Sequence, residues 1–130
     1  MAIPNYQSFM LPMLVLLQDG KEQRLGELVE ALAGKFDLST DERQQLLPSG
    51  QGTIVGNRVG WARTYLKKGG LIESSRRGYV TISARGLKVL ATKPERIDVK
   101  FLEQFPEFVA FRDLRHDPST ISSAAIVSSP

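Results

Sequence analysis

Residues 57–83 read NRVGWARTYLKKGGLIESSRRGYVTIS, and their pattern predicts a helix followed by a β-hairpin. Apolar residues recur through its first part at helical spacing, which predicts a helix over about 57–68. Gly69-Gly70 is expected to end that helix. The two short β-like runs 71–75 and 79–83 flank Arg76-Arg77-Gly78. The second part therefore predicts a hairpin with a basic tip.

The residues before this stretch predict three helices. The first runs from an Asn5 cap to about residue 19, and Pro12 should kink it or shift its start. The second spans about 24–36, and its apolar residues form one stripe. Ser39 and Glu42 have capping-box spacing and open a short third helix. We expect Leu46-Leu47 to anchor that helix in the core.

The residues after the hairpin change in character twice. Ser83 is expected to cap a helix that completes a domain over 1–92. Residues 93–115 are rich in phenylalanine and are split by Pro106 into two short helical pieces. We expect this extension to pack on the first domain or across a dimer contact, because exposed phenylalanines would form an apolar patch. The Ser-rich residues 116–130 predict a flexible linker or tail.

The order of the predicted elements is helix, helix, short helix, helix, two-stranded hairpin, helix. This order predicts a mostly α, α+β fold: a winged helix-turn-helix with an extra C-terminal helical segment. In such folds the helix before the hairpin lies in the major groove of DNA, and the hairpin is the wing.

Composition limits the classes of function. The chain has 130 residues, of which 42% are hydrophobic and 24% charged, and this is globular composition. It has no cysteine and one histidine, His116, which excludes disulfides, thiolate chemistry and His-rich metal clusters. No apolar run approaches the length of a membrane span, so we expect a soluble cytoplasmic protein without a membrane partner.

The charge is unevenly distributed. Residues 57–88 hold eight basic side chains and one acidic one, a local charge of +7, whereas the remainder carries −4. Such a block favours a polyanionic partner, although an unevenly charged, solvated surface would show the same pattern.

The predicted DNA contacts come from the 57–68 helix and from the hairpin tip. They are Asn57, Arg58, Trp61, Arg63, Thr64, Lys67, Lys68, Arg76 and Arg77. Asn57 and Arg58, at the expected helix start, are the candidates for reading base edges, because Asn can pair with adenine and Arg with guanine. Lysines and arginines elsewhere in the set suit phosphates.

Each of three residues has a structural alternative. Asn57 could be the cap of its helix. Arg58 could pair with an acid such as Asp41 or Glu42. Trp61 could be a core residue instead of a base-stacking one. Gly60 departs from good helix propensity, which close approach of a neighbouring helix or of DNA would explain.

The motifs of an ordinary active site are missing from the sequence. Gly50-x-Gly52 lacks the third glycine of a dinucleotide fingerprint, and Asp98-x-Lys100 lacks the upstream residues of a metal-nuclease motif. We therefore expect no catalytic residues, no metal site and no cofactor.

Several blocks resemble one known family. These are Ile3-Pro4-x-Tyr6-x-x-Phe9, the loop 47–51, the Asn57-Arg58-Val59-Gly60-Trp61-Ala62 block and the later Leu66-Lys67, Gly70-Leu71, Arg77-Gly78, Thr81 and Gly86. Together, over about residues 3–112, they resemble the N-terminal domain of Mrr-type (type IV) restriction endonucleases.

The resemblance implies a winged-helix domain that binds duplex DNA, methylated or unmodified. In that family a separate C-terminal nuclease domain cleaves DNA that carries methylated bases. We expect the present chain to lack that domain and not to cut DNA. A stand-alone winged-helix transcriptional regulator is the alternative, and homo-oligomers through the aromatic segment are a further expectation.

Overall fold

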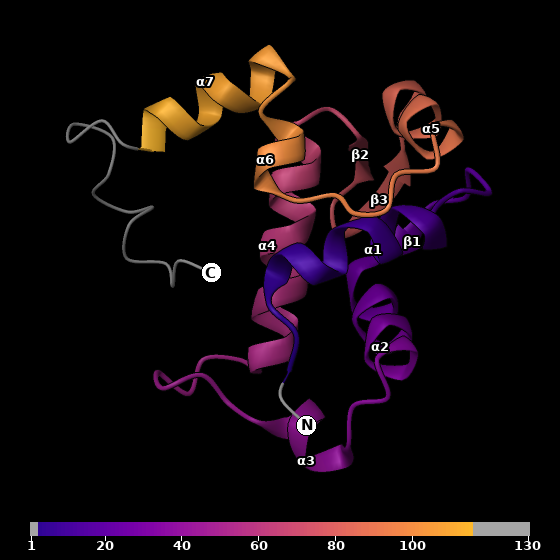
Figure 1. Ribbon diagram of the computed structural model, residues 1–130. Helices are drawn as coiled ribbons and strands as arrows, with labels where there is room; N and C mark the ends of the chain where they lie inside the picture. Colours follow the sequence, from indigo (N-terminus) through magenta and orange to yellow (C-terminus); the bar gives the residue numbers. More distant parts are fainter. Residues whose placement is uncertain (1–2, 116–130) are drawn as a thin grey trace.

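Helix α4 (Ile54–Lys68) is the long central helix of the computed structural model, which describes residues 3–115 (Figure 1). Its N-cap is Thr53, whose hydroxyl accepts a 3.1 Å hydrogen bond from the Gly56 N–H. The helix thus begins three residues earlier than expected, and Asn57 is its fourth residue rather than its cap. The predicted apolar face is confirmed. Its residues, all buried, are Val55, Val59, Ala62 and Leu66.

The N-terminal helix is divided at the place where Pro12 predicted an irregularity. A 3₁₀ turn, η1 (Tyr6–Phe9), opens with the Asn5 side chain accepting from the Ser8 N–H, as expected. Helix α1 (Met10–Leu16) follows, with Pro12 in its first turn, where a missing N–H costs no hydrogen bond. It ends before residue 19, and Gly20 adopts a positive φ of 83°.

Helices α2 (Leu25–Lys35) and α3 (Thr40–Gln44) lie in the lower part of Figure 1. The predicted capping box is present, because Ser39 and Glu42 exchange side-chain-to-backbone hydrogen bonds. The expectation for Leu46 was wrong. Helix α3 ends before it, and Leu46 instead forms a β-bridge with Thr53 and is 57% exposed.

The hairpin was predicted, but its third strand was not. Strands β2 (Ile72–Arg76) and β3 (Tyr79–Ile82) form the hairpin, and β1 (Gln23–Arg24) pairs with β3, giving the antiparallel order β1-β3-β2. Gly78 turns the tip with a φ of 82°, a conformation that a residue with a Cβ rarely adopts. Helix α5 (Ala84–Ala91) follows with the predicted Ser83 cap.

Strand β1, which lies between α1 and α2 in the chain, completes a winged-helix-like order of elements. The sheet is small, helices dominate, and α4 precedes the hairpin as the sequence predicted. The fold is therefore α+β and winged-helix-like, with two further helices at its C-terminal end.

Those helices, α6 (Val99–Leu102) and α7 (Pro106–Arg115), pack near the upper end of α4 in Figure 1. Proline opens α7, at the helix position that best tolerates it. Ile97, Leu102 and Phe108 of this segment are buried in the same core as residues of α1 and α4. The predicted tail, 116–130, lies outside the described residues.

Candidate nucleic-acid interface

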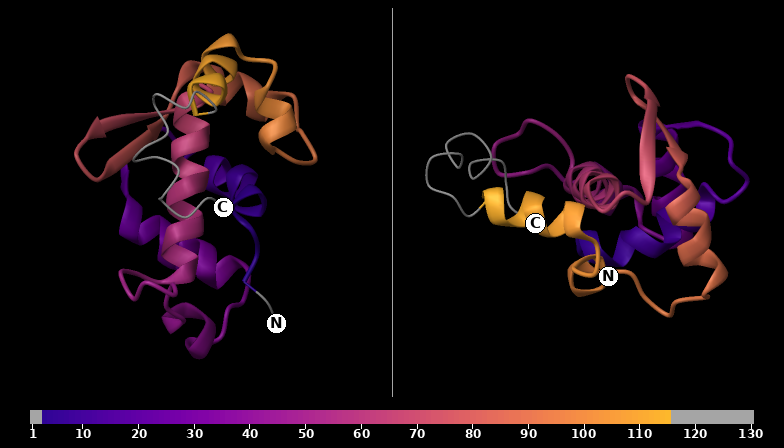
Figure 2. Two further views of the ribbon diagram at one scale, coloured as in Figure 1. Left: turned by 90° about the vertical axis from the view of Figure 1, so that its left-hand side faces the viewer. Right: turned by 90° about the horizontal axis from the view of Figure 1, so that it is seen from above.

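One face of α4 is open. At 100° per residue, Asn57, Gly60, Thr64 and Lys67 project on the side opposite the buried residues. Figure 2 (left) shows this helix toward the viewer, with the hairpin standing out to one side and α6 and α7 above. A shallow hollow lies on this face, and its lining residues are Asn57, Gly60, Trp61, Arg63 and Thr64.

Gly60 meets nothing on this face. A Cβ built on it would have no atom of another element within 4 Å. Close approach of a neighbouring helix, one of the two explanations for this glycine, is therefore excluded within the described part of the chain. The other explanation for this glycine, close approach of DNA, remains.

Trp61 divides its surface between the core and the open face. It is half-buried and meets Tyr65 edge to face, with ring centroids 5.8 Å apart at 89°. Tyr65 in turn contacts the rings of Tyr6, Phe108 and Phe111. The indole is thus fixed by a core cluster while it also lines the hollow.

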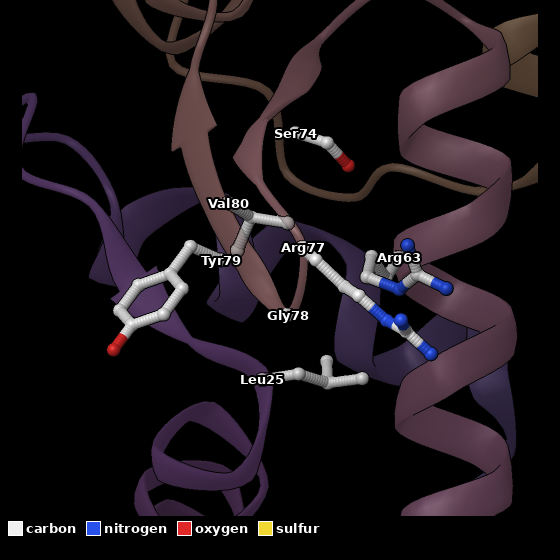
Figure 3. Close-up of a pocket in the computed structure, with 7 residues that line it drawn as sticks. All are labelled: Leu25, Arg63, Ser74, Arg77, Gly78, Tyr79 and Val80. Atoms are coloured by element: carbon white, nitrogen blue, oxygen red, sulfur yellow. The ribbon is translucent and has the colours of Figure 1, made fainter.

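The two arginines of the hairpin tip diverge. Arg76 pairs with Glu22 at 2.8 Å and stacks over the Tyr79 ring at 3.9 Å. Figure 3 shows Arg77 on the other side of the tip, directed toward α4 beside Arg63, with the Tyr79 ring turned away. Arg76 therefore lies on the side of the hairpin where Glu22 and the Tyr79 ring are, whereas Arg77 faces α4.

Glu22 ties the hairpin to the loop before β1. Besides the Arg76 ion pair, its carboxylate accepts a 2.7 Å hydrogen bond from the Ser75 hydroxyl. The Ser75 hydrogen bond is the largest cause of a lowered Glu22 pKa, and the charge of Arg76 adds to it. The carboxylate is thus ionised at neutral pH and can hold the wing in place.

Arg58 is committed to protein contacts. Its guanidinium donates to the carbonyl oxygens of Ile3 at 2.6 Å and Pro4 at 3.2 Å. It does so from the side of α4 that faces the N-terminal segment, and its partners are neither Asp41 nor Glu42. The structure favours a structural role for Arg58, because a side chain holding two carbonyls is poorly placed to read a base.

Arg85 also has internal partners, so the basic block does not form one surface. Its guanidinium donates to the Gly69 carbonyl at 2.9 Å and pairs with Glu107 at 2.9 Å, lowering the Glu107 pKa. It lies 4.7 Å from the centroid of the Phe105 ring. Among the residues that the structure describes, four cations of the basic block remain around the open face. They are Arg63, Lys67, Lys68 and Arg77, of which Lys68 lies 5.4 Å from the Phe111 ring centroid.

Two side chains near the interface were missed by the sequence interpretation. Ser74 lines the space between the hairpin and α4, and Glu22 holds the hairpin. No spacing signal identifies them, because both roles depend on how the sheet is placed. In residues 3–115, no group of three or more acidic or histidine side chains could hold a metal ion, and no helix is long and apolar enough to span a membrane.

Comparison with known proteins identifies the fold family. Over 96 residues, 73% of this chain, the sequence is 33% identical to the type IV methyl-directed restriction enzyme EcoKMrr of Escherichia coli strain K12. The chain spans 31% of the length of that relative. No solved structure matches it. The family model of the Mrr N-terminal domain matches residues 6–92, which include α4 and the hairpin. The chain therefore belongs to the Mrr N-terminal domain family.

Proposed function

We propose that this chain is the DNA-binding, target-recognition module of an Mrr-like restriction system. Helix α4 enters the major groove of duplex DNA, and the hairpin β2–β3 follows the adjacent backbone as a wing. The observation that carries the proposal is the open face of α4, which is flanked by cations without acidic partners. In the described part of the chain, Arg63, Lys67 and Arg77 form no ion pair.

The proposal divides the interface by chemistry. Asn57, Thr64 and Trp61 line the hollow at the centre of the α4 face and contact base edges. Arg63, Lys67, Lys68 and Arg77 surround them and contact phosphates, which supply most of the affinity but no sequence information. Arg58 and Arg76 act indirectly, by holding the N-terminal segment and the wing.

The proposal assigns recognition to this chain and cleavage to another part of the system. The named relative is a restriction enzyme, and this chain spans less than a third of it. The target is duplex DNA, with methylated and unmodified sites as the two cases to be compared.

The test is a titration of short duplexes at several salt concentrations. The four cations neutralise four phosphates, or three if two of the cations share one, so log K should fall against log salt with a slope of about −2.7 to −3.6. Lys67→Ala should weaken binding to all duplexes alike and make the slope shallower by about one contact. Lys88→Ala is the matched control, because Lys88 is an exposed lysine of the same basic block on α5.

Three results would contradict the proposal. They are a salt-independent affinity, an equal loss of binding in the two lysine variants, and cleavage of the duplex by the pure protein with magnesium present. Running the titration with methylated and unmethylated copies of each duplex reports in addition whether the module itself distinguishes them.

A further inference from the structure

We propose that Arg63 and Arg77 form a shared binding site for one phosphodiester group of the DNA backbone, in the notch between α4 and the hairpin tip. This inference rests on the proposed function and deepens it, because it assigns a single backbone phosphate to two arginines from different elements. The notch would fix how the wing is placed relative to the recognition helix.

The notch is a built feature of the fold. It has a volume of about 310 Å3 and is lined by Arg63 of α4, by Ser74 and Arg77 of the hairpin, by residues 78–80 of the turn and β3, and by Leu25. In Figure 3 the Arg63 and Arg77 side chains lie next to each other, and the Ser74 hydroxyl is directed to the same space. The two guanidinium groups and the Ser74 hydroxyl thus line one space, and the lining residues that the structure describes there include no acidic side chain.

Arg63 has an unsatisfied donor. Its Nε atom is buried and has no hydrogen-bond partner within residues 3–115. A buried N–H without an acceptor loses its hydration without compensation, so such groups are rare in folded proteins and call for a missing partner. Protein atoms cover Nε in the unbound chain, so a phosphate would reach it after a small shift of the guanidinium, and arginine would then donate two parallel hydrogen bonds to two oxygens of that phosphate.

The charges support the same partner. Two guanidinium groups side by side repel each other, and neither has an acidic partner in the described chain. The neighbouring Arg76 differs, because it is neutralised by Glu22 on the opposite side of the tip. A bound phosphate would remove the repulsion, and its negative charge would be shared between helix and wing.

Double-mutant binding measurements test whether one phosphate is shared. Arg63→Ala and Arg77→Ala should each weaken binding to a short duplex by about tenfold or more, since both lose charge-assisted hydrogen bonds. The double variant should bind little worse than the weaker single variant, and all three should lower the salt slope by about one contact. Lys88→Ala is the control, because Lys88 is an exposed residue of α5 outside the lining of the notch, and it should leave the slope unchanged.

Arg63→Lys tests the Nε donor while the charge is kept. We expect it to retain the salt slope of the wild type and to lose affinity, because lysine lacks the planar fork. Wild-type affinity in Arg63→Lys would overturn the role of Nε. Single-variant losses that multiply in the double variant, with a slope lowered by two contacts, would overturn the shared phosphate while leaving DNA binding intact.

A wild-type chain that does not bind DNA would give a different result from a chain that binds DNA without the shared phosphate. If the wild-type chain binds no duplex, the notch is tested with inorganic phosphate, by following the side-chain NMR signal of the Arg63 Nε–H. A saturable shift that Arg77→Ala abolishes would keep the phosphate site without the DNA. Absence of a shift in the wild type would overturn the site.

Discussion

The Arg58 guanidinium donates a 2.6 Å hydrogen bond to the Ile3 carbonyl, which joins two positions 55 residues apart in the chain. The Pro4 carbonyl accepts from the same nitrogen at 3.2 Å. Ile3 itself is buried in the core, at 8% exposure. The second turn of α4 thus holds the segment that leads into η1, on the side of the helix away from the hairpin.

Arg58→Ala is therefore expected to reduce stability and to leave sequence preference unchanged. Loss of two hydrogen bonds from a charged, half-buried group should lower the free energy of unfolding by about 1.5–3 kcal/mol. Thermal melting measures the first effect, and the ratio of affinities for a preferred and a scrambled duplex measures the second. A collapse of that ratio with unchanged melting would instead restore Arg58 to the base-reading set.

The ionisation of Glu22 predicts that the stability of the folded protein depends on pH. The pKa of Glu22 is lower in the folded chain than in the unfolded chain, where it is about 4.3. The ionised carboxylate therefore stabilises the fold fully above about pH 4.3. This stabilisation is lost as the pH falls through the lower pKa of the folded chain. Glu22→Gln should destabilise the protein at pH 7, and the difference from wild type should disappear under acid conditions. Melting of both proteins from pH 7 to pH 3 is the measurement. A difference that stays constant over this range would show that the charge of Glu22 does not hold the hairpin.

Local signals in the sequence were sufficient for several elements. Asn5, Ser39 and Ser83 cap helices as predicted, because a cap depends on residues three positions away. The hairpin followed from apolar runs around an Arg-Gly turn. Strand β1 could not be predicted, since two residues carry no alternation and become a strand by pairing with β3.

The candidate site depends more on distant contacts, and this limited its prediction. The start of α4 was misplaced because Gly52 and Gly56 suggested a loop, whereas Thr53 caps the helix between them. The internal role of Arg58 depends on backbone carbonyls more than 50 residues away. The sequence also could not predict that Arg76 pairs with Glu22 whereas Arg77 is directed toward α4. Adjacent residues at a turn point to different sides, and what lies on each side depends on the fold.

Phe108 tests whether the C-terminal helices are part of the folded unit. It is 1% exposed and packs edge to face on Tyr65 of α4, at 5.6 Å between ring centroids. Phe108→Ala should lower the free energy of unfolding by about 3–5 kcal/mol, because it leaves a cavity in the core. The half-buried Phe101 is the matched control, and Phe101→Ala should cost clearly less. Denaturant unfolding compares the two, and a Phe108→Ala curve that coincides with the wild type would mean that α7 contributes nothing to the core.

Substitution of Gly60 tests the stability of α4 and the binding of DNA separately, because the two should change in opposite directions. Nothing in another element lies within 4 Å of the position of its missing Cβ, so Gly60→Ala should stabilise α4 by about 0.5–1 kcal/mol, because alanine is the better helix former. The same methyl group would occupy the centre of the open face, where the backbone of α4 is proposed to approach DNA, and affinity should fall. Gly34→Ala in α2 is the matched control. Its Cβ would meet the Arg43 guanidinium only at an ordinary 3.9 Å, so it should leave binding unchanged. Melting and duplex titration of both variants give the answer, and a Gly60→Ala protein that is more stable and binds as well as the wild type would exclude the open face of α4 as the interface.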